Sequence, residues 1–338
     1  MKIALFMCAL LALSAITAEA AEPPAHDAAY MTASDLLAHP PATLDGYWAT
    51  KKRVGDDTFH AAQQDMVVTL LASSRGSKCN IPGNIVAAEA AMTLADGIKD
   101  EVVWRRVSAQ VTHALVERDA ISHRLVAGKT TATYYADVAD AYRRAGQGTD
   151  PRARDLARQV ATDRFTIKDG YAINRGLVWA RGLPKEAQAY LQLYLTPAYC
   201  EAHNTSTDWL HWDFADHGWP KISTSGAQMD HDAGLLAIDA LDDIDLQHRI
   251  LDALTLLLSR HDTSPENYAG LYDQIAWEEK RPQRYGTKID CDYNHPGEWT
   301  LYSMEDVDQL DARRATLGLP TESDYTKDLF STDQNPCP

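Results

Sequence analysis

The chain contains 338 residues, with 32 Lys and Arg residues against 48 Asp and Glu residues and a formal net charge of −16. This length exceeds what one hydrophobic core usually organises, so it predicts one large domain or two smaller ones. The apolar share of 45% and the charged share of 24% are typical of a globular protein and exclude a disordered chain. The acidity argues against a nucleic-acid-binding protein, because phosphate binding needs a basic surface.

The acidic excess lies in one part of the chain. Residues 1–200 contain 22 basic and 21 acidic residues, a balance of +1, whereas residues 201–338 contain 10 and 27, a balance of −17. This shift, together with Pro197 and the polar stretch at 201–208, predicts a domain boundary near residue 200. We therefore expect a helical region at 21–200 and an acidic C-terminal domain at 201–338.

Residues 1–20 have the pattern of a signal peptide. Lys2 precedes an apolar run at 3–16, and Ala18-Glu19-Ala20 is an A-x-A cleavage site. The run is short for a transmembrane helix, although an uncleaved anchor is the alternative, and no later segment is long and apolar enough to span a bilayer. We expect a periplasmic or secreted protein that is cleaved near Ala20 and then has no integral membrane segment.

Export leaves four cysteines, Cys79, Cys200, Cys291 and Cys337, in an oxidising compartment. An even number of cysteines there favours two disulfides, and three pairings are possible. We expect Cys79–Cys200 and Cys291–Cys337, because each bridge then stays within one charge region. No CxxC motif is present, so catalytic thiol chemistry is the less favoured use.

Helical patterns follow one another along the chain. Apolar residues at helical spacing and helix-start signals predict helices at 59–74, 84–95, 101–126, 131–145, 150–162 and 184–195. Further helices are expected at 225–240 and 245–259, and after the capping residues Ser264 and Ser303. Only 285–289 and 299–302 have strand character. The sequence therefore predicts a mainly α protein, a helical N-terminal region followed by a helical C-terminal domain with at most two short strands.

The segment 200–232 gathers ionisable and aromatic side chains. Its side chains His211, Asp213, His217 and His231 are of the types that bind a divalent metal ion such as zinc. His217 and His231 are also candidates for general acid–base catalysis near neutral pH. No spaced metal-binding signature such as HExxH is present. The alternative is an acidic surface segment whose tryptophans are buried.

The loop at 281–287 is a second candidate site. Gly286 permits a backbone conformation that is closed to other residues. Such a loop can present Gln283, Tyr285 and Thr287 as hydrogen-bonding groups to a small polar ligand. The alternative is that Tyr285 packs in the interior and Gln283 satisfies a buried backbone group.

Four short motifs occur in the last third of the chain. They are Gly218-Trp219-Pro220, Ser223 or Ser225 with Gly226, Gln283-Arg284-Tyr285-Gly286-Thr287, and Arg313-Arg314 leading to Gly318-Leu319-Pro320 and Tyr325. In combination they resemble a bacterial domain family of unknown function that is marked by GWP, S-x-x-G, Q-x-Y-G-T and R-x-x-x-G-L-P segments. The resemblance leaves residues 21–200 without a recognised family.

This resemblance adds candidate positions to those in the loop. It implies that Trp219, Asp273 and Arg313 belong to the same ligand-binding set as Gln283 and its neighbours. Members of the family typically carry Gln-His near the end of a helix where this chain has Ile238-Asp239. Asp239 is therefore a further candidate catalytic residue. If the family's His is catalytic or binds a ligand, this chain has lost or altered that role.

The sequence leaves three functions open. The first hypothesis is a periplasmic binding or interaction protein that uses the 283–287 loop and the acidic segment to bind a small polar ligand, a glycan or a peptide. The second is a hydrolase, with or without a divalent metal as cofactor, that acts on a cell-wall glycan or peptide. The third is a purely structural helical protein whose acidic surface confers solubility.

Overall fold

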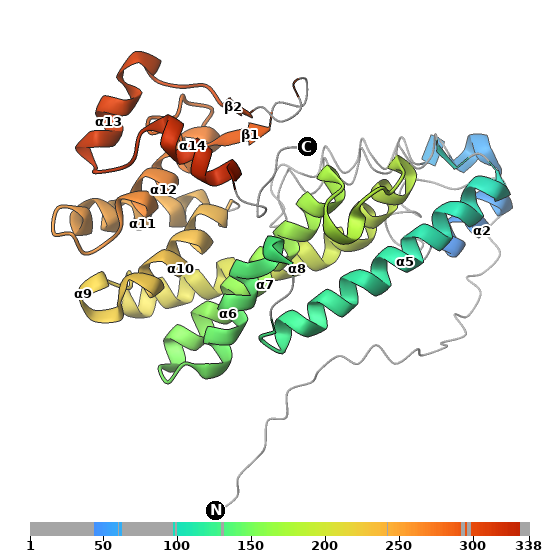
Figure 1. Cartoon of the computed structure of the whole chain (residues 1–338), viewed down its shortest axis with the longest axis horizontal. Coiled ribbons are helices and arrows are strands. Elements are labelled where there is room, and N and C mark those ends of the chain that lie inside the picture. Colours follow the sequence, from blue (N-terminus) through green and yellow to red (C-terminus); the bar gives the residue numbers. More distant parts are fainter. Residues whose placement is uncertain are drawn as a thin grey trace, which may run out of the picture.

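The fold is mainly α-helical, as the sequence predicts (Figure 1). The computed structural model describes residues 44–59, 61–62, 97–98, 100–129, 132–241, 243–291, 295 and 299–331. The helices of the first two thirds are α2 (Leu44–Val54), α5 (Glu101–Val126), α6 (Ala136–Gln147), α7 (Pro151–Arg175) and α8 (Lys185–His217). The later helices are α9 (Ile222–Ser225), α10 (Ala227–Asp239), α11 (Ile244–Leu258), α12 (Pro265–Glu278), α13 (Leu310–Thr316) and α14 (Glu322–Ser331).

The remaining elements are short. Three 3₁₀ turns, η1 (Thr133–Tyr135), η2 (Val178–Ala180) and η3 (Val307–Gln309), link the helices, and β1 (Ile289–Cys291) pairs antiparallel with β2 (Trp299–Leu301). The first expected strand thus begins four residues later than predicted, because the segment before it forms a loop around a buried carboxylate. Within the described residues, no helix is both long and apolar enough to cross a membrane.

The helices α6, α7 and α8 form the middle of the molecule. In Figure 1 they lie between α5 and the C-terminal helices, and α7 packs against both α6 and α8. Phe165 and Ile173 of α7 belong to a core shared with α5, whereas Leu156 and Val160 belong to a second core shared with α10, α11 and α12. A single helix therefore takes part in both of these hydrophobic cores.

The chain does not break near residue 200, where the fall in charge predicted a boundary. Instead, α8 continues from Lys185 to His217 with Pro197 inside it. A proline inside a helix removes one backbone hydrogen bond and costs about 3 kcal/mol, and the helix nevertheless continues through it. The helix expected to end near residue 195 is thus wrong at its C-terminal end, and a division into two domains stays a prediction.

The predicted end of the helix at 150–162 is also wrong, because α7 continues to Arg175. The inward face of this added stretch carries Asp163, Lys168 and Asp169, which are all buried. Polar residues at inward positions interrupt the apolar periodicity from which a helix is predicted. The helix ends where Gly176 adopts a left-handed conformation with φ of 62°.

Several expectations fall on residues outside the described part of the chain. They concern the signal peptide at 1–20, most of the helix at 59–74, the helix at 84–95, and two of the cysteines, Cys79 and Cys337. Cys200 is disulfide-bonded. The proposed pairing of Cys79 with Cys200 and of Cys291 with Cys337 stays a prediction.

Candidate functional site

The loop at 283–287 closes around the carboxylate of Asp273. Asp273 lies on α12 with no exposed surface, and its Oδ1 accepts hydrogen bonds from the backbone N–H groups of Arg284 and Tyr285 at 2.7 and 3.0 Å. Its Oδ2 accepts from the N–H and the Oγ1 of Thr287, both at 2.9 Å. Successive N–H groups of this kind form an anion-binding concavity. Here the anion is a side chain of the protein itself.

Gln283 and Tyr285 have the packing roles that the sequence left as the alternative. Nε2 of Gln283 donates to the carbonyl oxygens of Lys288 and Tyr302 at 3.0 and 3.1 Å, and its Oε1 accepts from the N–H of Lys288 at 2.8 Å. The ring of Tyr285 is buried and lies 5.6 Å from the ring of Tyr272. These side chains hold the loop and leave it little capacity for a ligand.

The closing R-x-x-x-G-L-P segment clamps the same loop. Nε of Arg313 donates to the carbonyl oxygen of Arg284 at 2.9 Å. Arg314 is buried, and its Nη1 donates to the carbonyl oxygen of Tyr285 at 2.6 Å while its Nε donates to that of Pro320 at 2.6 Å. Arg313 is therefore placed by contacts with the backbone of the loop.

Trp219 of the GWP segment belongs to another buried carboxylate site. Its Nε1 donates to Oδ1 of Asp230 at 2.7 Å, and the hydroxyl of Thr263 donates to the same oxygen at 2.6 Å. Oδ2 of Asp230 accepts from the N–H of Ser264 and from Nδ2 of Asn267, both at 2.9 Å. This network connects α10 to the start of α12 and saturates the carboxylate, so Trp219 has a structural contact.

The candidate metal ligands do not gather in one place. Nδ1 of His211 lies 3.3 Å from Oδ2 of Asp243, the N-cap residue of α11. His217 pairs instead with Asp213 at 3.3 Å, one turn away on α8, and His231 is exposed on α10. The part of the chain that the structure describes contains no group of three metal-binding side chains.

Asp213 has a second partner that explains its position. Nε and Nη2 of Arg152 donate to its two carboxylate oxygens at 2.9 and 2.8 Å. Nη2 of Arg152 also donates to the carbonyl oxygen of Gly218 at 2.9 Å. A bidentate arginine pair is a strong structural contact, and it joins the first turn of α7 to the end of α8.

Asp239, at the end of α10, is half-buried in a cluster of ionisable groups. Burial, and after it the negative charge of Asp163, raise the pKa of Asp239 to about 6, while the positive charges of Arg164 and Lys288 act in the opposite direction. Oδ1 of Asp163 is 3.6 Å from Nδ1 of His203, and both residues are buried. Oδ2 of Asp239 and both carboxylate oxygens of Asp163 have no hydrogen-bond donor among the described residues. This cluster can accept or hold a proton.

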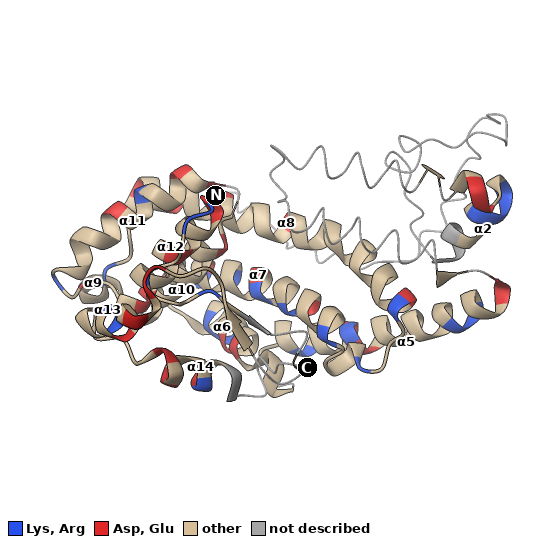
Figure 2. Cartoon of the chain, turned by 90° about the horizontal axis from the view of Figure 1, so that it is seen from above, with Lys and Arg blue, Asp and Glu red and all other residues tan. Residues whose placement is uncertain are grey.

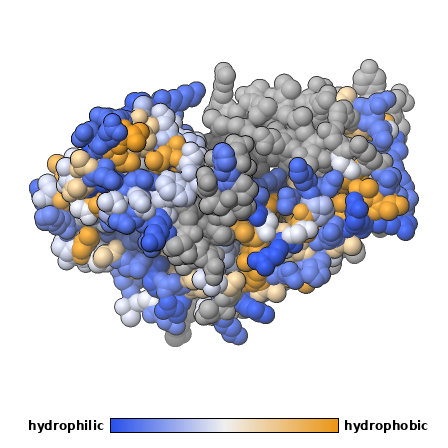
Figure 3. Space-filling view, turned by 45° about the horizontal axis from the view of Figure 1, so that its top comes forward, coloured by the Kyte–Doolittle hydropathy of each residue, from blue (hydrophilic) through white to orange (hydrophobic). Residues whose placement is uncertain are grey.

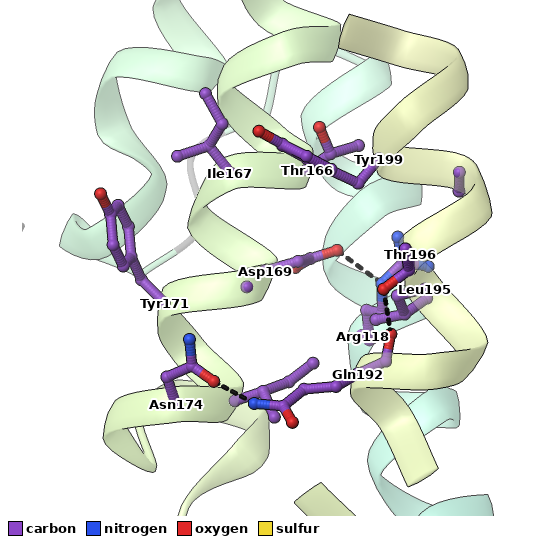
Figure 4. A pocket seen from close by; sticks show the side chains of 13 residues that line it. Arg118, Thr166, Ile167, Asp169, Tyr171, Asn174, Gln192, Leu195, Thr196 and Tyr199 are labelled. Atoms are coloured by element: carbon purple, nitrogen blue, oxygen red, sulfur yellow. Dashed lines mark hydrogen bonds and ion pairs between the residues drawn. The ribbon is translucent and has the colours of Figure 1, made fainter. Parts of the chain in front are cut away.

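A pocket of about 210 Å³ opens between α7 and α8 beside Arg118 of α5 (Figure 4). Its walls are largely apolar, and they include Ile167, Ile173, Leu195, Ala198 and the rings of Tyr171 and Tyr199. A hydrogen bond from Nε2 of Gln192 to Oδ1 of Asn174 joins the two helices at its side. A concave apolar site with a few polar groups is the usual form of a small-molecule site.

Asp169 and Arg118 provide the charged groups of the pocket. Nε of Arg118 donates to Oδ2 of Asp169 at 2.6 Å. The other oxygen accepts from the hydroxyl of Tyr135 at 2.9 Å and from Nε1 of Trp179 at 3.2 Å. Burial raises the pKa of Asp169, and the adjacent Arg118 opposes this rise. Three donors therefore hold one buried carboxylate at the base of the pocket.

The pocket and the cluster around Asp239 lie next to each other. Thr166 lines the pocket, and its hydroxyl donates to the carbonyl oxygen of Asp163 at 2.8 Å. Tyr199 also lines the pocket, and its ring stacks on His203 with 5.8 Å between the ring centres. The Asp163–His203 pair is thus in direct contact with residues that line the pocket.

This pocket could not be predicted from the sequence. Arg118 and Asp169 are 51 residues apart, and no motif marks either of them. The sequence contained one indication of the pocket. The polar residues Asp163, Lys168 and Asp169 lie on a segment whose apolar residues repeat with helical spacing. Buried polar residues in such a segment indicate a site with paired charges.

The motif residues of the last third contact one another in the fold, through Asp230, Asp273 and the two arginines of the closing segment. The resemblance to a bacterial domain family of unknown function rests on these residues alone. No family model matches the chain, and no curated protein and no solved structure matches it.

Proposed function

We propose that the protein is an exported binding protein that takes a small, mainly apolar molecule into the pocket between α7 and α8. The observation that carries this proposal is the pocket itself, with apolar walls around the buried pair Arg118–Asp169. Apolar surface removed from water supplies affinity, and a few fixed polar groups supply orientation. Periplasmic or secreted location is part of the proposal and rests on the signal-peptide pattern at 1–20.

The pocket replaces the 283–287 loop as the proposed binding site. The loop's N–H groups donate to Asp273, and its carbonyl oxygens accept from Arg313 and Arg314. A ligand would have to displace these internal hydrogen bonds, each of which contributes about 1–3 kcal/mol. We therefore propose a structural role for the loop, as part of a C-terminal region related to the bacterial family that it resembles.

The exposed surface also favours a pocket over a broad docking face. Exposed apolar side chains lie on different helices, such as Val116 on α5, Trp212 on α8 and Leu256 on α11. On the described part of the face in Figure 3, apolar areas are separate and polar areas lie between them. Scattered apolar residues are normal for a protein surface and indicate no partner.

The test is a substitution that fills the pocket. Ala198 lines the pocket from an exposed position, so Ala198→Trp should block it while leaving the fold intact. Ala215→Trp is the matched control, since Ala215 is exposed on the same helix and does not line the pocket. Hexan-1-ol, octan-1-ol and decan-1-ol would be titrated by ligand-observed NMR.

We expect at least one of these alcohols to bind the wild type and the control alike, and to bind Ala198→Trp about tenfold more weakly or worse. Circular dichroism and the melting temperature would verify that both variants are folded. Equal binding to Ala198→Trp, or a wild type that binds neither these alcohols nor octanoate, would overturn the proposed function.

A second candidate function is hydrolysis of a cell-wall glycan or peptide by general acid–base catalysis. The observation that favours it is Asp239, whose pKa is raised to about 6 by burial and by the neighbouring Asp163. A carboxyl group that titrates near neutral pH suits proton transfer. Incubation of the mature protein with peptidoglycan should then release fragments that Asp239→Asn does not release. Equal release by both proteins would refute this function.

A further inference from the structure

We infer that the pocket selects a carboxylate-bearing amphiphile, a molecule with an apolar tail and one anionic group that binds Arg118. This inference rests on the proposed binding function and names its ligand class. It follows from the way in which the hydrogen-bonding groups of the pocket are distributed between internal partners and the open space.

Arg118 is fixed in place but keeps donors for a ligand. Its Nε donates to Asp169 at 2.6 Å, its Nη1 makes a long contact of 3.4 Å with Asp119, and its guanidinium lies 5.1 Å from the ring centre of Phe165. Among the described residues, none accepts a hydrogen bond from Nη2 of Arg118. A guanidinium has five donors in a planar fork, and a carboxylate can accept two of them together.

Asp169, in contrast, has little capacity left. Its two oxygens accept from Arg118, from the hydroxyl of Tyr135 and from Nε1 of Trp179. The side chain is buried, and these donors compensate most of its charge. The group that still presents donors to the pocket is therefore the cation and not the anion of the pair.

The rest of the pocket fits an apolar tail. Ile167, Ile173 and Leu195 line it together with the ring of Tyr171, whose face is covered by the guanidinium of Arg175 at 4.7 Å. Arg175 is thus a second cation beside a residue that lines the pocket, and its charge adds to the attraction for an anionic group. A volume of about 210 Å³ limits the tail to a short or medium chain.

The charge distribution of the molecule also permits an anion here. The residues of this pocket lie between 118 and 199, within the nearly neutral first 200 residues. Figure 2 shows Lys and Arg residues along α7 and residues of both signs on α5 and α6, whereas several acidic residues lie around α11, α12 and α13. An anion entering between α7 and α8 therefore avoids the acidic part of the surface.

The experiment compares octanoate with octan-1-ol, which share the tail and differ in the head group. Both would be titrated at neutral pH, where octanoate is ionised, into the wild type, Arg118→Met and Arg124→Met. Arg124 is exposed on the same helix and does not line the pocket, so its substitution is the matched control. Ala198→Trp identifies binding that occurs outside the pocket.

We expect the wild type and Arg124→Met to bind octanoate about tenfold or more tightly than octan-1-ol, because a hydrogen bond to a charged group exceeds one to a hydroxyl. Arg118→Met should lose this preference and keep its affinity for octan-1-ol. If the loss of Arg118 unfolds the protein, the comparison of the two ligands on the wild type alone decides.

The possible results separate the two proposals. Binding of neither ligand, or binding that persists in Ala198→Trp, overturns the proposed function and this inference together. Binding of octan-1-ol as tight as that of octanoate, or an octanoate preference that survives in folded Arg118→Met, overturns only the inference. The pocket would then accept neutral molecules without selecting an anion.

Discussion

Asp273→Asn should destabilise the protein strongly, although it replaces a carboxylate by an amide of almost the same shape. In the wild type, Oδ1 accepts from the N–H groups of Arg284 and Tyr285, and Oδ2 accepts from the N–H and the hydroxyl of Thr287. An amide keeps one acceptor oxygen and turns an NH2 group toward the other pair of donors. At least one buried backbone N–H group then faces another donor, and the loop has to rearrange.

The size of the effect follows from these four hydrogen bonds. A hydrogen bond to a charged group contributes about 1.5–3 kcal/mol, and a buried donor without an acceptor costs about 1–3 kcal/mol. With two of the four bonds lost and partial relaxation of the loop, the free energy of unfolding should fall by about 2–4 kcal/mol. Asp252→Asn is the matched control, because Asp252 is exposed on α11 and should leave the stability unchanged.

A double-mutant cycle attributes this loss to the loop. Thr287→Val removes only the hydroxyl donor to Asp273 and should cost about 1 kcal/mol in the wild type. In the Asp273→Asn background the same change should cost less, because the hydroxyl then faces a neutral amide in place of a carboxylate. Urea denaturation followed by circular dichroism measures all four proteins. A wild-type-like midpoint for Asp273→Asn, or equal costs of Thr287→Val in both backgrounds, would refute the closed loop.

Three other predictions test separate features. Because the pKa of Asp239 is raised from 3.8 to about 6, the folded state binds this proton more tightly than the unfolded chain does. As the pH rises from about 4 to about 6, the free energy of unfolding of the wild type should therefore fall by about 2–3 kcal/mol relative to that of Asp239→Asn. A difference in urea midpoints that does not change with pH would contradict this. Gly286→Ala should cost about 1–2 kcal/mol in urea denaturation, since φ is 66° and a Cβ would lie 3.2 Å from Leu310. Gly146 lies on α6 with open space around it, so Gly146→Ala should instead stabilise the protein by about 0.5–1 kcal/mol. If both substitutions changed the free energy of unfolding in the same direction, this reasoning would be refuted. Trp219→Phe should lower the melting temperature by several degrees, because Asp230 loses one donor while Thr263 and the start of α12 keep theirs; an unchanged temperature would show that this bond is dispensable.

The helices that the sequence predicted well are those with strong start signals or an uninterrupted apolar stripe. The expected bounds of 101–126 are those of α5, with Asp100 as its N-cap. At α12, Ser264 accepts a hydrogen bond from the N–H of Asn267 and Pro265 occupies the first helical position, as predicted. In both cases the determining contacts lie within a few residues of each other, so the local sequence contains the information.

The helix ends that were missed depend on contacts between distant residues. The second half of α7 is stabilised by Asp169 pairing with Arg118 and by Lys168 donating to the carbonyl oxygen of Tyr134 at 2.7 Å. Neither partner is adjacent in sequence, so a polar inward residue is read as the end of a helix. The same reason explains why the pocket was missed and why the motif residues were predicted to face a ligand.

The motifs of the last third illustrate how a conspicuous string can be structural. Gln283, Tyr285 and Thr287 are hydrogen-bonding residues around a glycine, a pattern that is equally suited to a ligand or to an internal carboxylate. The choice between the two depends on Asp273, which lies ten or more residues away on α12. Because its side chain already supplies the anion, the loop has no need of an external one.

The net charge of −17 in the last 138 residues therefore overstates the acidic surface. Asp230 and Asp273 have no exposed surface, and Asp232 is buried where its Oδ1 accepts from Nη2 of Arg144 at 3.1 Å. Each of these carboxylates connects segments that are far apart in sequence, and none of them faces solvent. Some of the acidic residues in this region thus connect structural elements in the interior, which weakens the case for a cationic partner of this region. The same arrangement leaves the surface proposed to bind an anion to α5, α7 and the first half of α8, where Arg118 lines the pocket.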